Sequence, residues 1–176
     1  MMNWLGELVC DLVDPEESIL DLGCGILYPF APEGETHGGR RIGPRHFCVD
    51  PFRPYLDRIK GSGPVMQAVL PQVLKLFVDR SWDVVLLLDV VEHMKKEEAL
   101  SVLAGARTIA RRLVIIFTTD GFREGGKLDQ WGFSPNNYQT HRCGLKEEDL
   151  THLGYEVSRP RPRPRRETLL GVWTRP

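Results

Sequence analysis

The sequence has few cysteines and no long apolar run. Its four cysteines, Cys10, Cys24, Cys48 and Cys143, include no C-x-x-C pair, so the pattern indicates neither a cysteine-based zinc site nor a disulfide framework. No leading apolar segment is long enough for a signal peptide, and no apolar run is long enough to span a bilayer. We therefore expect a reduced, cytoplasmic protein without a membrane partner.

An excess of positive charge is also missing. The chain has 23 basic and 24 acidic residues and a formal net charge of −1. Five of the arginines lie in one Arg/Pro segment at 159–166; without them, 18 basic residues stand against 24 acidic ones, a net charge of −6. Such an acidic body argues against a general binder of nucleic acid. At 176 residues the chain is expected to form one domain, 1–176, with a full three-layer core.

Apolar runs that alternate with helical patterns predict an α/β fold with a mostly parallel sheet. The expected strands are 18–22, 46–50, 65–68, 82–88, 113–117, 155–158 and 168–173. The expected helices are 2–13, 54–60, 71–78, 95–110 and 145–153. In the longest helix, the predicted inner face consists of Leu100, Leu103, Ala104 and residues 107–109.

No helix is predicted directly after the first strand. Residues 29–44 contain three prolines and four glycines, and such a run cannot hold a stable helix. We expect a loop there, with at most one helical turn at 26–30. The sheet face that this loop leaves open is then covered either by the leading helix 2–13 or by a partner chain in a homodimer.

The first strand and the turn after it are the most informative segment. Residues 19–25 read I-L-D-L-G-C-G, and a second apolar run, 47–49, ends at Asp50. Closely spaced glycines let the backbone approach a ligand, because no Cβ stands in the way. An acid at the tip of the next strand is placed to accept both hydroxyls of a ribose. The two features together predict a nucleoside cofactor, although a glycine pair by itself is also common in ordinary α/β turns.

Asp21, the acid before the first glycine, helps to distinguish between possible cofactors. Residues 21–25 resemble the first motif, D/E-x-G-x-G-x-G, of class I S-adenosylmethionine-dependent methyltransferases, and in this family Asp21 has a role. The motif departs from the family at its last glycine, where the chain has Leu27. A dinucleotide fingerprint would need a glycine in place of Tyr28 and gives Asp21 no role.

The resemblance implies the Rossmann-like class I methyltransferase fold: a three-layer α/β sandwich around a seven-stranded, mostly parallel sheet whose last strand is antiparallel. It also implies S-adenosyl-L-methionine as cofactor and S-adenosyl-L-homocysteine as product. The implied cofactor residues are Asp21, Gly23, Cys24 and Gly25 near the methionine end, Asp50 at the ribose, Pro51, Phe52, Met66 and Gln67 beyond it, and Asp89, Val90 and Val91 at the methyl-transfer site.

One contact of the family is missing after the third strand. Family members often place an acid there to accept the adenine amino group, but residues 65–69 read V-M-Q-A-V. The side-chain carbonyl of Gln67 is expected to substitute for that acid, while Met66 and Phe52 sandwich the adenine ring.

Residues 89–94, D-V-V-E-H-M, resemble a motif that follows the fourth strand in small-molecule methyltransferases. His93 is a candidate general base; its alternative role is a helix-start residue bonded to the backbone. The resemblance to ubiquinone-pathway O-methyltransferases also allows a divalent-metal site with Asp89 and Glu92, but we expect no metal. The segment lacks the Asp/Asn-Pro-Pro-aromatic stretch of DNA amino-methyltransferases, and the Pro-Cys nucleophile of cytosine-5 enzymes is absent, so DNA is not an expected partner.

Residues 118–140 have no helical or strand period, which predicts a substrate lid. Trp131, Phe133 and Tyr138 are its candidate substrate-binding residues; the alternative is a disordered loop whose aromatic side chains cap the core. Residues 138–155 resemble a bacterial subgroup in which a histidine precedes the last helix and lies over the active site. This makes His141 a second candidate base, equal in weight to His93.

The Arg/Pro segment 159–166 admits three interpretations. It is a stiff polyproline-like connector, a basic patch for an anionic surface, or a set of arginines at the substrate opening that favours a phosphorylated or carboxylated substrate. The sequence as a whole predicts a methyltransferase for a small, anionic metabolite or biosynthetic intermediate. The alternatives are a non-catalytic assembly domain of the same fold and a nicotinamide-dependent oxidoreductase.

Overall fold

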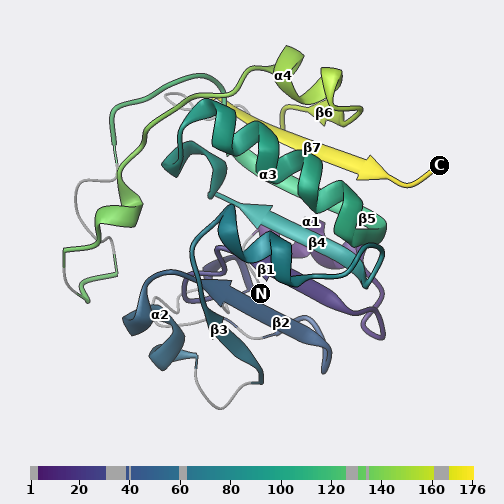
Figure 1. The fold of residues 1–176 in the computed structure, drawn as a ribbon, viewed down its shortest axis with the longest axis vertical. Helices are drawn as coiled ribbons and strands as arrows, with labels where there is room; N and C mark the ends of the chain where they lie inside the picture. The colour runs from purple at the N-terminus through teal and green to yellow at the C-terminus, as the bar shows by residue number, and fades with distance from the viewer. Residues whose placement is uncertain are drawn as a thin grey trace.

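The computed structural model describes residues 4–30, 39, 41–59, 63–125, 131–133, 135–160 and 167–176. Its centre is a seven-stranded sheet in the order β3-β2-β1-β4-β5-β7-β6, in which only β7 runs antiparallel to its neighbours (Figure 1). The strands are β1 (Ile19–Leu22), β2 (His46–Asp50), β3 (Val65–Gln67), β4 (Trp82–Leu88), β5 (Ala110–Thr119), β6 (Glu156–Ser158) and β7 (Thr168–Thr174). All seven predicted strands are confirmed, as are the strand directions implied by the family resemblance.

The described residues contain four α-helices and four 3-10 turns besides these strands. The α-helices are α1 (Trp4–Leu12), α2 (Arg53–Arg58), α3 (Lys96–Ile109) and α4 (Glu147–His152). The 3-10 turns are η1 (Tyr28–Phe30), η2 (Gln72–Leu76), η3 (Val91–His93) and η4 (Asn137–Gln139). Among the residues described, no helix has both the length and the apolar character needed to cross a bilayer.

Two of the helix predictions were partly wrong. The predicted helix 71–78 is the short 3-10 turn η2, because Phe77 is already extended at φ −97° and ψ 138° on the way into β4, and so short a segment favours i→i+3 bonds. In α3 the buried face consists of Ala99, Val102, Leu103, Ala106 and Ile109. Ala104 and Thr108, which were predicted to face inward, are exposed. Because alanines lie on both sides of α3, the sequence does not show which side is the buried one. Packing on the sheet determines how the helix is rotated about its axis.

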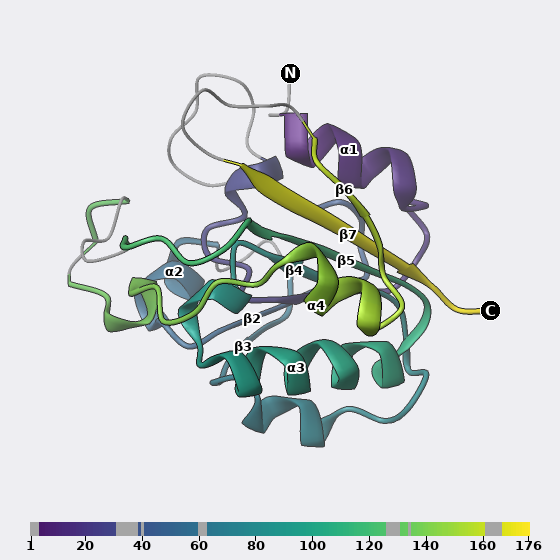
Figure 2. The same ribbon diagram turned by 90° about the horizontal axis from the view of Figure 1, so that it is seen from above.

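The sheet lies between two helical layers (Figure 2). One core contains the side chains of Leu20, Val85 and Ile116 together with those of α3 and α4. The other contains Ile19, Leu86 and the apolar side chains of α1. Successive strand residues point to opposite faces, which explains why β1, β4 and β5 contribute to both cores.

The leading helix α1 covers the sheet face that the predicted loop after β1 was expected to leave open, which is the first of the two covers expected there. A Cβ on Gly6 of α1 would lie 1.9 Å from the carbonyl oxygen of Pro29, so α1 and η1 are in direct backbone contact. Residues 23–30 contain a turn and η1, in agreement with the predicted loop with one helical turn. Residues 31–38 and 40 of the predicted loop lie outside the described residues.

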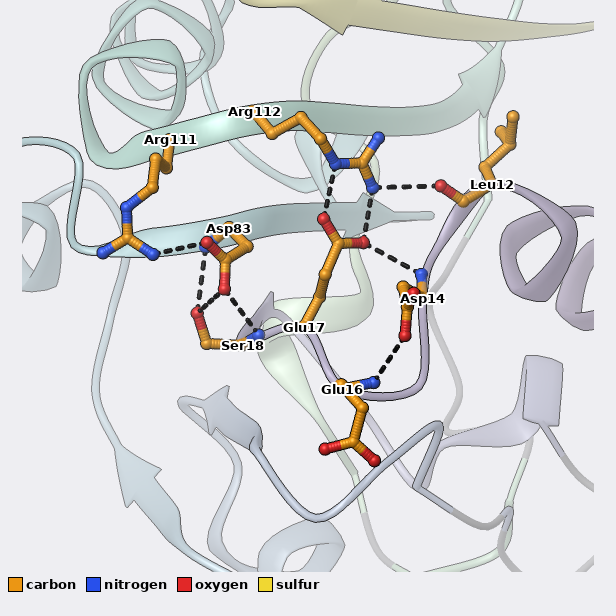
Figure 3. Close-up of polar contacts among 8 residues, drawn as sticks. All are labelled: Leu12, Asp14, Glu16, Glu17, Ser18, Asp83, Arg111 and Arg112. Atoms are coloured by element: carbon orange, nitrogen blue, oxygen red, sulfur yellow. Dashed lines mark hydrogen bonds and ion pairs between the residues drawn. The ribbon is translucent and has the colours of Figure 1, made fainter.

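The amino-terminal edge of the sheet is held by paired polar side chains (Figure 3). Ser18 donates its backbone N–H and its hydroxyl to Asp83 at 2.9 and 2.7 Å, and Arg111 pairs with the same carboxylate. Arg112 forms two bonds to Glu17 and one to the carbonyl oxygen of Leu12. These contacts join the starts of β1, β4 and β5. The charged side chains named here are therefore paired with one another.

The same substitution, alanine to leucine, at one buried and one exposed position of α3 tests which face of the helix packs on the sheet. Ala106→Leu introduces three carbons into a fully buried position, and overpacking of this kind typically costs about 1–3 kcal/mol. Ala104→Leu places the same side chain on the exposed face and should change stability by less than about 0.5 kcal/mol. Urea unfolding of both variants measures the difference. Equal destabilisation of the two variants would contradict the rotation described here.

Candidate active site

The candidate site lies where the carboxyl ends of β1, β2, β4 and β5 meet, which is where open α/β sheets place ligands. The loop after β1 is fastened to β2: the backbone N–H groups of Gly23 and Cys24 donate to the carbonyl oxygen of Val49 at 2.7 and 3.1 Å. A Cβ on Gly23, whose φ is +80°, would lie 2.5 Å from Cγ2 of Val90. Gly23 is therefore required by contact with the loop after β4.

The second glycine of the motif has a different role. Gly25 has φ +53°, and no heavy atom lies within 4 Å of the position that its Cβ would take. Of the two glycines, Gly25 is thus the one with open space beside its backbone. The sequence interpretation assigned ligand approach to both glycines; the space at Gly23 is taken by the protein itself.

Leu27, at the place of the motif's last glycine, has a backbone conformation that favours glycine. Its φ is +59°, in the left-handed region, which costs a non-glycine residue roughly 1–2 kcal/mol. Its side chain is fully buried in the core beneath α1, and such burial stabilises by about 1.5–3 kcal/mol. Burial of the side chain therefore offsets the backbone strain.

Asp50 closes the loop after β1 onto β2. Its Oδ2 accepts the N–H of Gly25 at 3.0 Å, and its Oδ1 accepts the N–H of Phe52 at 2.8 Å. Burial raises the pKa of Asp50 to about 6, against the opposing effect of these two backbone donors. The structure thus brings together the glycine motif and the acid that the sequence predicted at the ribose.

The residues after Asp50 form a chain of contacts toward the predicted lid. Gln67 lies opposite Asp50 in the β2–β3 register and donates its side-chain N–H to the carbonyl oxygen of Pro51 at 3.1 Å. That bond uses the amide nitrogen, so the carbonyl oxygen is the acceptor that remains. Phe52 packs edge-on against Tyr55 at 4.8 Å between ring centroids, and Tyr55 against Phe133 at 5.6 Å.

Glu92 fastens the segment before α4 to the end of β4. Its backbone carbonyl accepts the N–H groups of Arg142 and Cys143 at 2.7 and 3.2 Å. Its buried side chain accepts the hydroxyl of Thr118 at 2.9 Å. Burial, reinforced by the nearby charge of Asp89, raises the pKa of Glu92 to about 8. The sequence had suggested this residue only as a metal ligand and gave no sign of its bond to β5.

The two candidate bases meet, with ring centroids 5.0 Å apart. Nδ1 of His141 lies 3.0 Å from the carbonyl oxygen of Arg123; since a carbonyl only accepts, Nδ1 carries the proton and Nε2 has the free lone pair. Nδ1 of His93 is buried and has no hydrogen-bond partner. Burial and the neighbouring His141 lower the pKa of His93 to about 4, so its imidazole is neutral at physiological pH.

This histidine pair also offers metal-ligand atoms. One nitrogen of each ring and one carboxylate oxygen of Glu92 lie within 4.8 Å of one another. These are ligand types for a divalent transition metal. The set differs from the alternative in the sequence analysis, since His141 takes the place of Asp89.

The predicted lid 118–140 begins later than expected. Thr118 and Thr119 belong to β5, because β7 pairs with this strand as far as Thr119, and residues 137–139 form η4. Asn136 is buried: its Oδ1 accepts the N–H of Tyr138 at 3.0 Å, and its Nδ2 has no hydrogen-bond partner. Phe133 and Tyr138 are 37% and 43% exposed. Residues 126–130 and 134 of the predicted lid lie outside the described residues.

The first arginine of the Arg/Pro segment is engaged in ion pairs. Arg159 contacts Asp120 at 3.1 Å and also pairs with Glu147. Lys146 binds the same Asp120 at 3.1 Å. Arg159 therefore lies beside the carboxyl end of β5, the sheet edge at which the sequence analysis placed the exit from the strand before it. Residues 161–166 lie outside the described residues.

No family model matches the chain, and no curated protein matches it. Solved structures do resemble it. A SAM-dependent methyltransferase from Archaeoglobus fulgidus is 15% identical, with a TM-score of 0.61 over 97% of this chain and 94% of that one. Magnesium protoporphyrin IX methyltransferase from Synechocystis with bound SAH is 19% identical, with a TM-score of 0.61 over 98% and 80%.

A third similar structure is 1,6-didemethyltoxoflavin-N1-methyltransferase from Burkholderia thailandensis, which is 16% identical with a TM-score of 0.62 over 98% of this chain and 77% of that one. At these identities the likeness concerns the fold. The chain has the class I methyltransferase fold, as the resemblance of its motifs implied.

The interaction between the two histidines can be measured directly. An NMR pH titration of the ring nitrogens should place the pKa of His93 at about 4, well below the ordinary value of about 6.5 for histidine. His141→Ala should raise this pKa, because it removes one of the two causes of the shift, whereas His152→Ala, at an exposed histidine in α4, should leave it unchanged. An ordinary pKa for His93 in the parent protein would contradict the burial described here.

Proposed function

We propose that the chain is an S-adenosylmethionine-dependent methyltransferase that acts on a small molecule. The observation that carries the proposal is the bond between the N–H of Gly25 and the buried carboxylate of Asp50, beside open space at Gly25. A nucleoside needs this combination: a backbone that a ligand can approach and an acid for its ribose. The fold supports the proposal, since similar structures carry SAH or SAM.

The other proposed contacts with the cofactor involve residues that surround Asp50. Asp21 and the backbone of Gly25 lie on the β1 side and would hold the methionine end. The free carbonyl oxygen of Gln67 would accept the adenine amino group, with Phe52 and Met66 beside the ring. Residues 89–91, in contact with the glycine loop through Val90, would line the methyl-transfer site.

The two histidines would remove the proton of the acceptor. The cofactor supplies a sulfonium methyl group that is already activated, so the chain must mainly hold the nucleophile in line, which can provide about 7–11 kcal/mol. Nε2 of His141 has a free lone pair and His93 is neutral, as a base requires. General-base catalysis of this kind adds about 10²–10⁴-fold.

The substrate would enter beside the segment that contains Trp131, Phe133 and Tyr138. Asn136 adds a buried amide donor without a partner, which a polar substrate atom could satisfy. Similar structures are named for small-molecule substrates, magnesium protoporphyrin IX and 1,6-didemethyltoxoflavin. A preference for anionic substrates would depend on the arginines beyond Arg159, because Arg159 is itself paired with acids.

Calorimetry with S-adenosylhomocysteine tests the cofactor site, with NAD⁺ as the control ligand. We expect micromolar binding of S-adenosylhomocysteine and none of NAD⁺. Asp50→Ala should weaken binding at least about 10-fold, since it removes a charged acceptor worth roughly 1.5–3 kcal/mol, while Glu97→Ala, at an exposed acid of α3, should not. Affinity should also fall as the pH drops through about 6, where Asp50 takes up a proton.

Two outcomes of that titration count against the proposal. The absence of binding at neutral pH would favour the non-catalytic assembly domain of the same fold. Binding of NAD⁺ in preference to S-adenosylhomocysteine would favour the oxidoreductase.

The role of the histidines is tested once a substrate screen has found an accepted substrate. His93→Ala and His141→Ala should each lower kcat by about 10²–10⁴-fold, with His152→Ala as the matched control. Treatment with EDTA should leave the rate unchanged if the pair acts as a base. A rate abolished by EDTA and restored by a divalent ion would instead identify Glu92, His93 and His141 as metal ligands.

A further inference from the structure

A fully buried histidine lies beneath the glycine loop and touches its acid. His46, at the start of β2, has no exposed surface, and its Nε2 lies 3.0 Å from Oδ2 of Asp21, itself 3% exposed. The sequence analysis treated His46 only as the first residue of a strand. The structure shows that the acid of the family motif has a dedicated partner.

The backbone fixes the tautomer of this histidine. The N–H of Ile42 points at Nδ1 of His46 at 3.2 Å. A backbone amide can only donate, so Nδ1 must be the acceptor. Burial lowers the pKa of His46, but the bond to Asp21 outweighs it and raises the pKa to about 9. A proton on Nδ1 would nevertheless face the N–H of Ile42, so the ring that fits this geometry is the neutral one, which carries its proton on Nε2 and donates it to Asp21.

The same tautomer argues against a metal at this position. Ligand atoms of Asp21, His46 and Cys48 lie within 4.8 Å of one another, but a metal on Nε2 would move the proton to Nδ1, where it would face the N–H of Ile42. The sulfur of Cys48 also already accepts a bond from Arg41 at 3.3 Å. The ligand atoms of the cluster are therefore already engaged in hydrogen bonds with one another and with Arg41.

The surroundings hold the ring in one orientation. Phe30 packs edge-on against His46 at 5.9 Å between ring centroids, and Arg41 donates to its backbone carbonyl. In the β1–β2 pair, His46 lies opposite Ile19, and Asp21 lies opposite Cys48. The bond from His46 to Asp21 is therefore a diagonal contact between neighbouring strands, fixed at both of its ends.

We infer that His46 is a positioning residue for the cofactor: it engages Oδ2 of Asp21 and directs the other carboxylate oxygen toward the methionine end of the ligand. The inference rests on the proposed function. Asp21 and Asp50 are two buried acids on the neighbouring strands β1 and β2, and the charge of Asp21 acts on Asp50. A neutral donor orients Asp21 without placing a cation beside the ligand.

The test compares two ligands that differ only at the methionine end. S-adenosylhomocysteine carries the amino-acid group, and 5′-methylthioadenosine lacks it. His46→Phe keeps a ring but removes the donor, so it should weaken the binding of S-adenosylhomocysteine by about 5–150-fold, the equivalent of one unsatisfied buried partner. Its affinity for 5′-methylthioadenosine should stay within about twofold.

Two further variants complete the design. His46→Gln retains both an N–H donor for Asp21 and an acceptor for Ile42, and it should restore most of the affinity for S-adenosylhomocysteine. His152→Phe makes the same replacement at an exposed histidine and should change neither ligand. Equal loss of both ligands in His46→Phe, or no loss of either, would overturn the inference; binding of neither ligand by the parent protein would instead remove the proposed function on which it rests.

A second measurement needs no variant at position 46 and stays informative if His46→Phe does not fold. Ring ¹⁵N shifts of the parent protein at neutral pH should show His46 neutral with its proton on Nε2. Addition of S-adenosylhomocysteine should shift this signal, and addition of 5′-methylthioadenosine should not. A proton on Nδ1, or an equal response to both ligands, would contradict the inference.

Discussion

The carboxylate of Asp50 is the group on which the arrangement of the site depends. Each of its oxygens accepts one backbone N–H, one from the loop after β1 and one from the start of the segment before α2. A buried carboxylate is costly unless donors surround it, and the two loops can supply these donors only in their present conformation. The burial of Asp50 therefore accounts for the fixed glycine turn, and it also raises the pKa of Asp50 against the effect of the two donors.

Much of the fold could be predicted because its signals are local. The strands are continuous apolar runs, and β2 and β4 have the predicted bounds. The rotation of α3 was different, since Leu100 and Ala104 fit a helical stripe as well as Ala99 and Ala106 do. Only contact with the sheet separates the two stripes.

The candidate site likewise contains features that the sequence could predict and features that it could not. The glycines, Asp50 and residues 89–93 stand in recognisable order along the chain, so a motif could find them. The bonds of His46 to Asp21 and of Glu92 to Thr118 could not be found in this way, because the partners lie 25 and 26 residues apart and meet only through strand pairing. The positive φ of Leu27 was equally hidden, since its residue type does not indicate a left-handed conformation.

The cover of one sheet face by α1 has a consequence for how the chain is made. The apolar side chains of α1 pack against Phe117 and Leu170, which are synthesised more than 100 residues later; the ring of Trp4 lies 5.5 Å from that of Phe117. During translation the helix therefore emerges without its partner surface, and contacts of such sequence separation form slowly. A helix made before the whole sheet is among the last elements that can reach its final place.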